Sequence, residues 1–294
     1  MTGPRRLRRA IESAATTLAR SGVDSARTDA ELLAAHLTGI DRGRLAFADD
    51  PEESFFQAFE AAVARRAHRV PLQHITGTAA FGPLSLSVGP GVFVPRPETE
   101  AILEWAAAQH LPEPPVIVDV CTGSGALAAA LSRRYPAARI VAVDDDPVAL
   151  GYARRNTAQT AVEVLEGDAT DPHLLAELDG AVDLVVSNPP YIPVGADLEP
   201  EVSEHDPPHA LFGGPDGMAV IRPIVARASR WLVGGGLLAV EHDDTTSALT
   251  VEAICAIGAF TDVQAHSDLA GRPRFVTARR RTDQGGETQR RQPK

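Results

Sequence analysis

The sequence has few cysteines and no long apolar run. Its two cysteines, Cys121 and Cys255, lie far apart, and no Cys/His group has the spacing of a zinc site. This composition argues against a disulfide framework and against a structural metal. No stretch reaches the roughly 20 apolar residues of a membrane-spanning helix, and the basic first residues lack the apolar core of a secretory signal. We therefore expect a cytoplasmic protein without membrane association.

The chain also lacks a basic excess. It has 39 acidic and 28 basic residues, its formal net charge is -11, and its basic runs lie near the two ends. Proteins that grip duplex DNA usually present a basic face, because neutralising phosphates supplies most of their affinity. The charge balance therefore argues against direct binding of nucleic acid.

The N-terminal part of the chain is predicted to be helical. Its apolar residues recur close to the helical period of 3.6. Gly22 and Gly39 are placed to end the first two helices. Ser25 or Thr28 is expected to cap the second helix, and Pro51 is expected to open the third.

Strand and helix patterns alternate from residue 115 onward. Such alternation is typical of a mostly parallel sheet with helices on both faces, an α/β fold of the Rossmann-like kind. The strands are expected at 116–121, 139–144, 162–168, 182–188, 236–242 and 274–280.

These patterns divide the chain into four parts. A helical domain over 1–70 carries no constellation that looks catalytic, so we expect it to recognise the substrate. Residues 71–90 contain Gly-Pro pairs and alternating apolar residues, which indicate a hairpin linker. The α/β domain follows over 91–280. Residues 281–294 lack apolar side chains altogether, which predicts a disordered tail.

The first strand of the predicted sheet runs into a glycine loop, D-V-C-T-G-S-G-A-L-A. Gly123 and Gly125 would let a ligand approach the backbone at the carboxyl end of the strand, where open α/β sheets bind ligands. Asp144 ends the next strand, where a carboxylate can accept both hydroxyls of a ribose. The pattern fits a dinucleotide as well as S-adenosylmethionine. Asp119 and Asp168 favour S-adenosylmethionine, because they suit its ammonium and adenine amino groups and would repel a pyrophosphate.

The fourth strand runs into Asn188-Pro189-Pro190-Tyr191. Each proline fixes its own φ and keeps the residue before it out of the helical region, so the corner is rigid and extended. It presents the side-chain oxygen of Asn188 and the carbonyl of Pro189 side by side, which suits a planar NH2 group. Two acceptors can favour a pyramidal nitrogen and aim its lone pair at a methyl group. Tyr191 can wall the planar group, and no general base is required.

An N-P-P-Y corner after such a sheet resembles the amino-methyltransferases. These comprise adenine-N(6) methyltransferases, which act on DNA or RNA, and protein glutamine methyltransferases. The segments G-V-F-V-P-R-P-E-T-E, P-L-Q-H-I-T-G and A-L-F-G-G-P-D-G-M are similar to the HemK/PrmC family of release factor glutamine methyltransferases. That resemblance covers all of the chain except its tail.

The family resemblance implies a reaction. A methyl group would pass from S-adenosylmethionine, leaving S-adenosylhomocysteine, to the side-chain amide nitrogen of the glutamine in the GGQ motif. The substrates would be class I peptide-chain release factors, and the modification would tune translation termination. Adenine-N(6) methylation is the alternative, and it would need a basic groove and a pocket for a flipped base.

The expected site residues fall into two groups. The cofactor site comprises Asp119, Cys121, Thr122, Gly123, Ser124, Gly125, Asp144, Asp168, Ala169 and Asn188. The substrate site comprises the catalytic corner Asn188, Pro189, Pro190 and Tyr191 together with Phe93, Arg96, Thr99 and Glu241. Cys121 departs from the family, which has glycine there, and a positive φ at this position would strain a cysteine.

Overall fold

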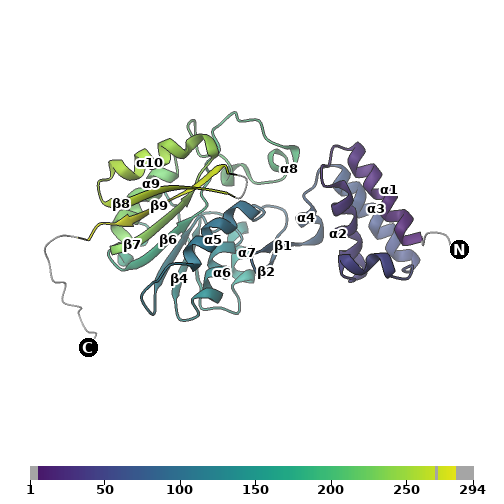
Figure 1. Ribbon diagram of the computed structural model, residues 1–294, viewed down its shortest axis with the longest axis horizontal. Coiled ribbons are helices and arrows are strands. Elements are labelled where there is room, and N and C mark those ends of the chain that lie inside the picture. The colour runs from purple at the N-terminus through teal and green to yellow at the C-terminus, as the bar shows by residue number, and fades with distance from the viewer. Residues whose placement is uncertain (1–5, 269–270, 283–294) are drawn as a thin grey trace. The chain divides into compact units, whose positions relative to one another are not determined.

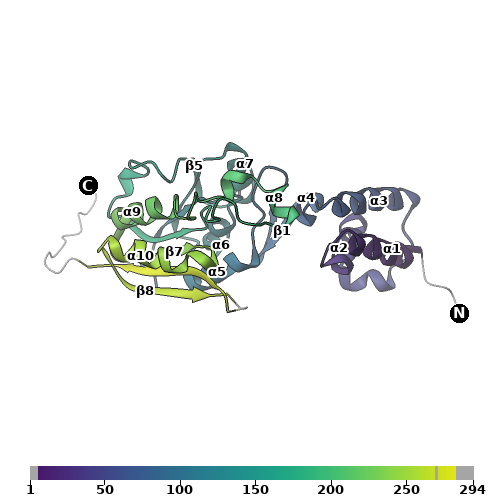
Figure 2. The ribbon, with the colours of Figure 1, turned by 90° about the horizontal axis from the view of Figure 1, so that it is seen from above.

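The computed structural model describes residues 6–268 and 271–282. The first helices bury the apolar residues whose spacing predicted them. The three longest helices of the N-terminal part, α1 (Arg6–Arg20), α2 (Ala26–Thr38) and α3 (Glu53–Ala67), pack side by side (Figure 1, Figure 2). A 3-10 turn, η1 (Arg42–Phe47), joins α2 to α3, and the short α4 (Leu72–Thr76) follows. Their core is apolar and includes Leu7, Ile11, Leu18, Leu33, Phe55 and Phe59.

Both predicted helix ends are confirmed, whereas the predicted cap of α2 and the predicted start of α3 are not. Gly22 has φ 75° in the turn after α1, and Gly39 closes α2 at φ 68°, both in the left-handed region that glycine tolerates. Ser25 occupies the N-cap position of α2, but its hydroxyl donates to the Asp29 carboxylate at 2.8 Å and caps no backbone N–H. The start expected at Pro51 is wrong, because α3 begins at Glu53.

The chain forms two compact units whose limits differ from the predicted domain limits. The helical unit extends to Ala79 and also takes in Ser87–Val94 and Leu198–Asp206. The other described residues form the sheet unit. The hairpin is present as β1 (Thr78–Phe81) and β2 (Leu84–Ser87), so the division between the units falls within its strands. The four predicted domain ranges stay a proposal.

A cluster of buried charges explains why Leu198–Asp206 belongs with the helices. Arg66 of α3 donates from Nε to Asp29 at 2.7 Å and from Nη1 to Glu201 at 2.9 Å. Glu201 lies in the short helix α8 (Pro200–Ser203) and also pairs with Arg69. The Arg66 and Asp29 side chains are 8% and 6% exposed. Because a buried charge is costly without a partner, Glu201 must stay where these arginines meet it.

The sheet unit contains seven strands in the order β5-β4-β3-β6-β7-β9-β8. The first five are parallel to their neighbours, and β9 and β8 are antiparallel. The mostly parallel sheet is therefore confirmed, whereas β8 had not been predicted. The strands are β3 (Val116–Val120), β4 (Arg139–Asp144), β5 (Glu163–Glu166), β6 (Val182–Ser187), β7 (Leu232–Glu241), β8 (Phe260–Ser267) and β9 (Pro273–Arg280). The tail prediction falls almost entirely outside the described residues.

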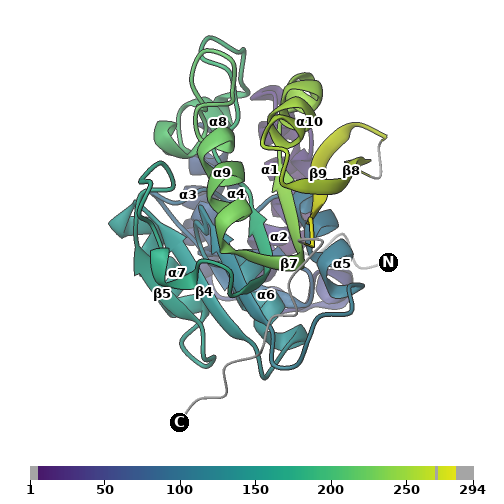
Figure 3. The same cartoon turned by 90° about the vertical axis from the view of Figure 1, so that its left-hand side faces the viewer.

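Helices cover both faces of this sheet, as the Rossmann-like interpretation requires. On one face lie α9 (Ile221–Trp231) and α10 (Ser247–Ala256), and on the other lie α5 (Glu100–Ala107) and α6 (Ala126–Arg134) (Figure 3). A further helix, α7 (Pro147–Asn156), connects β4 to β5. Among the described helices, none is both long and apolar enough to span a membrane.

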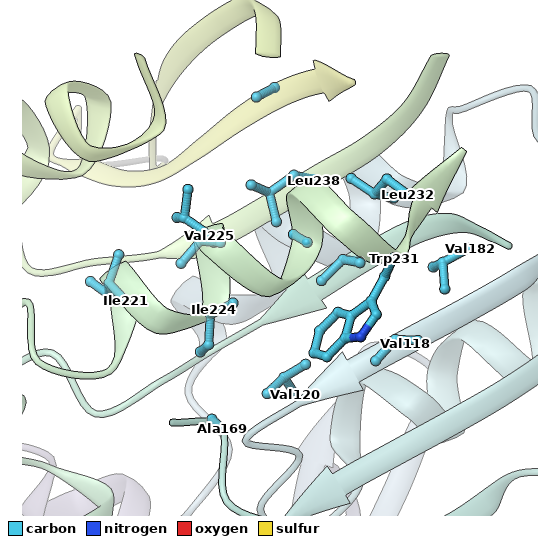
Figure 4. Close-up of a cluster of buried hydrophobic side chains, with 14 of the residues drawn as sticks. Val118, Val120, Ala169, Val182, Ile221, Ile224, Val225, Trp231, Leu232 and Leu238 are labelled. Atoms are coloured by element: carbon cyan, nitrogen blue, oxygen red, sulfur yellow. The ribbon is translucent and has the colours of Figure 1, made fainter. Parts of the chain in front are cut away.

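Trp231 fills the centre of the first of these two cores. Its indole extends from the end of α9 toward Val118 and Val120 of the sheet (Figure 4). The ring is fully buried, and its Nε1 donates to the Leu174 carbonyl at 3.1 Å, so its one polar atom is satisfied. This packing fixes α9 against the sheet.

Neutralising Asp29 is expected to destabilise the helical unit. Asp29→Asn removes a buried charge that faces Arg66, so we expect a loss of about 3 kcal/mol in the free energy of unfolding. Glu163→Gln is the matched control, because the Arg139–Glu163 pair is 49% and 45% exposed and should contribute less than about 1 kcal/mol. Urea unfolding followed by circular dichroism measures both, and equal losses would contradict the importance of the buried cluster.

Candidate active site

The carboxyl ends of β3 and β6 lie side by side at the centre of the sheet. Val120 is paired with Ser187, and the Ser187 hydroxyl donates to the Val120 carbonyl at 2.7 Å. The glycine loop and the N-P-P-Y corner begin at the residues that follow this pair. The register thus brings the two predicted motifs to one edge of the sheet, where α/β folds bind their ligands.

Backbone contacts hold the glycine loop against β4 and α7. Thr122 N donates to the Val143 carbonyl at 3.0 Å, and Gly123 N donates to Asp144 Oδ2 at 2.8 Å. A Cβ on Gly125 would lie 3.1 Å from the Ala153 Cα, and Gly125 has φ 80°, so a side chain here would be strained and would crowd α7. A Cβ on Gly123 would meet nothing within 4 Å. The loop therefore leaves room for a ligand to approach its backbone at Gly123.

Asp119 supplies a buried carboxylate beneath this loop. Its Oδ2 accepts from the Thr122 hydroxyl at 2.6 Å and from Ala128 N at 3.0 Å. Its Oδ1 is buried and has no hydrogen-bond partner among the described residues. Burial raises the pKa of Asp119 to about 7. An orphaned carboxylate oxygen is what the ammonium group of S-adenosylmethionine would satisfy, so these residues fit that cofactor.

Further predicted cofactor residues lie at the carboxyl ends of β4 and β5. Asp144 is partly buried, which raises its pKa, and it accepts hydrogen bonds from Gly123 N and Asp146 N. Asp168 is exposed, and hydrogen bonds from the Thr170 hydroxyl and N–H hold its pKa below the usual range. Ala169 beside it is buried. One carboxylate thus lies at the loop, and one remains open to solvent at the end of the neighbouring strand.

Cys121 has a backbone conformation that favours glycine, the residue that the family resemblance leads us to expect at this position. Its φ is 58°, in the left-handed region where a side chain other than glycine is strained. Burial, together with the nearby carboxylates of Asp144, Asp145 and Asp119, raises the pKa of its thiol well above the ordinary value. The thiol is therefore neutral, and it fills space where a reactive thiolate would be unstable.

In the N-P-P-Y corner the structure fixes the orientation of the Asn188 amide. Its Nδ2 donates to the Thr99 hydroxyl oxygen at 3.0 Å. Thr99 ends the 3-10 turn η2 (Pro97–Thr99) and is buried. With the nitrogen engaged, Oδ1 is the atom left to accept, and no group in the described part of the chain donates to it. No described backbone N–H donates to the Pro189 carbonyl either.

Tyr191, the last residue of the corner, is tied to the end of β7. Its hydroxyl donates to Glu241 Oε1 at 2.9 Å. Glu241 is fully buried, which raises its pKa to about 7, and the hydroxyls of Thr99 and Tyr191 and the charge of Arg274 act against that rise. Arg274 of β9 was not among the predicted site residues. An arginine at the start of a strand gives no sequence signal that would have identified it.

A second glycine-rich segment supports the corner from behind. Gly213 N donates to the Ile192 carbonyl and Ile192 N donates to the Leu211 carbonyl, both at 2.9 Å. A Cβ on Gly213 would lie 2.5 Å from the Pro190 oxygen, and one on Gly217 would lie 2.2 Å from the Tyr191 oxygen. The A-L-F-G-G-P-D-G-M segment thus needs glycines because it packs directly on the backbone of the corner.

The structure joins four of the predicted substrate residues in two hydrogen-bonded pairs, Asn188 with Thr99 and Tyr191 with Glu241. Arg96 precedes η2 in the sheet unit. Phe93 belongs to the helical unit, and its role in the pocket stays a prediction.

Fold and site together place the chain in the class of Rossmann-like methyltransferases. A methyltransferase from Pyrococcus furiosus shares the fold, with a TM-score of 0.53 and 18% identity over 74% of this chain and 98% of that one. A family model described as the PrmC N-terminal domain matches residues 9–77, and one described as the methyltransferase small domain matches residues 101–204.

Two relatives extend this likeness over nearly the whole chain. The release factor glutamine methyltransferase of Mycolicibacterium smegmatis is 69% identical over 94% of this chain and 98% of its own. That of Mycobacterium tuberculosis strain H37Rv is 63% identical over 93% and 91%. The chain belongs to the HemK/PrmC family of release factor glutamine methyltransferases.

Substituting Gly217 is expected to displace the corner. In Gly217→Ala the new Cβ would collide with the Tyr191 carbonyl, and Gly217 also has φ 73°. Because a misplacement of about 1 Å can cost about a hundredfold in rate, we expect a loss of that order in kcat/KM for methyl transfer. Gly195→Ala is the control, since Gly195 also has a positive φ but faces open space. Equal losses in the two variants would show that backbone strain, and not the collision, is responsible.

The raised pKa of Asp119 predicts that protons compete with the cofactor. Its carboxyl is protonated below about pH 7, whereas a bound ammonium group favours the charged form. Affinity for S-adenosylmethionine should therefore be roughly tenfold weaker at about pH 6 than at about pH 8. Titration calorimetry across this range measures the change, and Asp119→Asn should bind weakly with little pH dependence. A wild-type affinity that does not change with pH would contradict this role.

Proposed function

We propose that this protein transfers a methyl group from S-adenosylmethionine to the side-chain amide nitrogen of a glutamine, that of the GGQ motif of class I peptide-chain release factors. The second product is S-adenosylhomocysteine. The reaction takes place in the cytoplasm, where release factors work with ribosomes, and it tunes translation termination. Membership of the release factor glutamine methyltransferase family supports this class of substrate.

The orientation of Asn188 is the observation that carries the proposal. A carboxamide NH2 has two hydrogens, and the corner offers the Asn188 side-chain oxygen and the Pro189 carbonyl as two acceptors. The Asn188 nitrogen is already engaged by Thr99 at 3.0 Å, so it is not turned toward the substrate. Two fixed acceptors draw electron density onto the substrate nitrogen and orient its lone pair. Because the corner holds these acceptors in place before the reaction, no reorganisation is needed when the methyl group is transferred.

The cofactor residues would act mainly by positioning. When bound, S-adenosylmethionine supplies an electrophilic methyl group on a sulfonium. Asp119 would hold its ammonium group, Asp144 its ribose hydroxyls, and the loop Cys121–Gly125 would lie along its methionine part. Asp168 and Ala169 would receive the adenine. Holding donor and acceptor in line lowers the entropic part of the barrier.

The proposed reaction needs no dedicated proton acceptor in this site. The substrate nitrogen becomes positively charged as it gains the methyl group, and it then releases a proton readily to water. None of the residues assigned to the corner has to act as a general base. Tyr191 would wall the planar amide, with its hydroxyl held by Glu241.

The helical unit would recognise the release factor. Its helices and buried charges make a stable body without a catalytic constellation of its own, and the PrmC N-terminal domain model matches it over residues 9–77. The corner's geometry would also suit the amino group of adenine. The net charge of -11 favours a protein substrate and argues against direct binding of nucleic acid.

Replacing Asn188 tests the proposal directly. Asn188→Ala removes one of the two acceptors, so methyl transfer to a release factor should fall by about a thousandfold. S-adenosylmethionine should still bind, with a much smaller loss of affinity, because Asn188 is only one of the residues expected to line the cofactor site. Transfer is measured with labelled cofactor, and binding by calorimetry. Mass spectrometry of a mixture that contains a release factor and a DNA oligonucleotide locates the label. Label on the GGQ glutamine supports the proposal, and label on adenine would overturn it.

A further inference from the structure

The residues between the N-P-P-Y corner and the glycine-rich segment behind it form a loop whose base is closed. Ile192 and Phe212 are bridged, and Gly213 N donates to the Ile192 carbonyl at 2.9 Å. Ile192 directly follows the corner, and a Cβ on Gly213 would lie 2.5 Å from the Pro190 oxygen. The base of this loop, residues 193–211, is therefore continuous with the backbone that supports the corner.

The tip of the 193–211 loop belongs to the helical unit. Its residues Leu198–Asp206 group with the helices, whereas the residues on either side of them belong to the sheet unit. Glu201 makes the connection, because its Oε1 accepts from Arg66 Nη1 at 2.9 Å and its Oε2 accepts from Arg69 Nη2. The Glu201 and Arg66 side chains are 18% and 8% exposed, so water screens their attraction only weakly. Both oxygens of the Glu201 carboxylate thus hold the tip on the helices.

A second segment that contacts the corner also continues into the helical unit. The Thr99 hydroxyl oxygen accepts from the Asn188 amide at 3.0 Å. Thr99 lies shortly after Val94, which ends another part of the helical unit. The chain therefore connects the helical unit to the corner through two separate segments. In the first of these, the connection depends on the charge pairs of a single residue, Glu201.

We propose that Glu201 is a positioning residue that couples the helical unit to the N-P-P-Y corner through the 193–211 loop. The inference rests on the proposed function, because the release factor is the partner assigned to the helical unit. Glu201 acts without touching the substrate. By fixing the tip it reduces the number of conformations open to the loop, so the base stays paired and the corner stays in place. Catalysis by positioning depends on this, because it tolerates little displacement.

Glu201→Gln tests the coupling by kinetics. The variant keeps the shape of the side chain but removes the charge that pairs with the two arginines. Arg66 keeps Asp29 as a partner at 2.7 Å, so we expect the helical unit to stay folded. For an intact release factor, kcat should fall about tenfold, because the corner is held less firmly. The dissociation constants of the release factor and of S-adenosylmethionine should each stay within about twofold of wild type.

The comparison of kcat with binding separates three roles of Glu201. A residue that only stabilises the fold would lower the melting temperature and leave kcat per folded enzyme at the wild-type value. A residue that contacts the release factor would weaken its binding and leave the single-turnover rate at saturating release factor unchanged. Either of these results would overturn the inference.

Glu204→Gln is the matched control, because Glu204 is exposed in the same loop. The same chemical change there should leave kcat and both dissociation constants at their wild-type values. If Glu201→Gln does not fold, Glu201→Asp takes its place. This variant keeps the charge beside the arginines, but its side chain is shorter by one methylene group and cannot span both contacts without moving the tip. A fall in kcat of about threefold in Glu201→Asp supports the inference, and wild-type kcat contradicts it.

Hydrogen exchange measures the coupling without any reaction. The backbone N–H groups of Ile192, Val194 and Gly213 are hydrogen-bonded at the base of the loop. In Glu201→Gln they should exchange about tenfold faster, because a free tip lets the base open more often, while the N–H groups within β3 and β6 keep their wild-type rates. Unchanged exchange at the base would overturn the inference. Wild-type enzyme that labels no glutamine would instead contradict the proposed function, and the exchange rates would still show whether Glu201 controls the base of the loop.

Discussion

The hydrogen bond from the Asn188 amide nitrogen to the Thr99 oxygen is the constraint on which the site depends. An amide presents a donor and an acceptor on opposite sides, so engaging the nitrogen at 3.0 Å decides where the oxygen points. The partner comes from η2, which lies 89 residues earlier in the chain. The P-R-P-E-T-E segment, which contains Thr99, therefore meets the N-P-P-Y corner in the fold. The first segment orients what the second presents.

Two separate devices keep the corner rigid. The prolines restrict its backbone angles, and the segment around Gly213 and Gly217 packs on its carbonyl groups at distances that exclude any side chain. Two carboxyl groups near the ligand site are buried at an energetic cost. Burial disfavours their charged forms and raises the pKa of both Asp119 and Glu241 to about 7. Strained or poorly solvated groups of this kind are tolerated where they meet a ligand or orient a group that does.

Much of the fold and the outline of the site could be predicted from the sequence, because both depend on local patterns. The strands and the loops that follow them are set by short apolar runs, glycines and prolines, and their parallel pairing brings Gly123 and Asn188 to one edge. The contacts that come from distant segments could not be predicted. Arg274 approaches Tyr191 from β9, and Glu201 joins Arg66 across 135 residues. From sequence alone, a charged side chain on a helix is expected to face solvent, because most charged side chains do. Nothing in the local sequence shows that the fold will bury it.

The most direct test of the account is a crystal structure of the protein with S-adenosylhomocysteine and a peptide that contains the GGQ motif. The glutamine amide nitrogen should lie about 3 Å from both Asn188 Oδ1 and the Pro189 carbonyl oxygen, with its lone pair toward the sulfur. Asn188 Nδ2 should remain on Thr99. An amide nitrogen bound by only one of these oxygens, or an Asn188 amide rotated so that its nitrogen faces the substrate, would contradict the central claim.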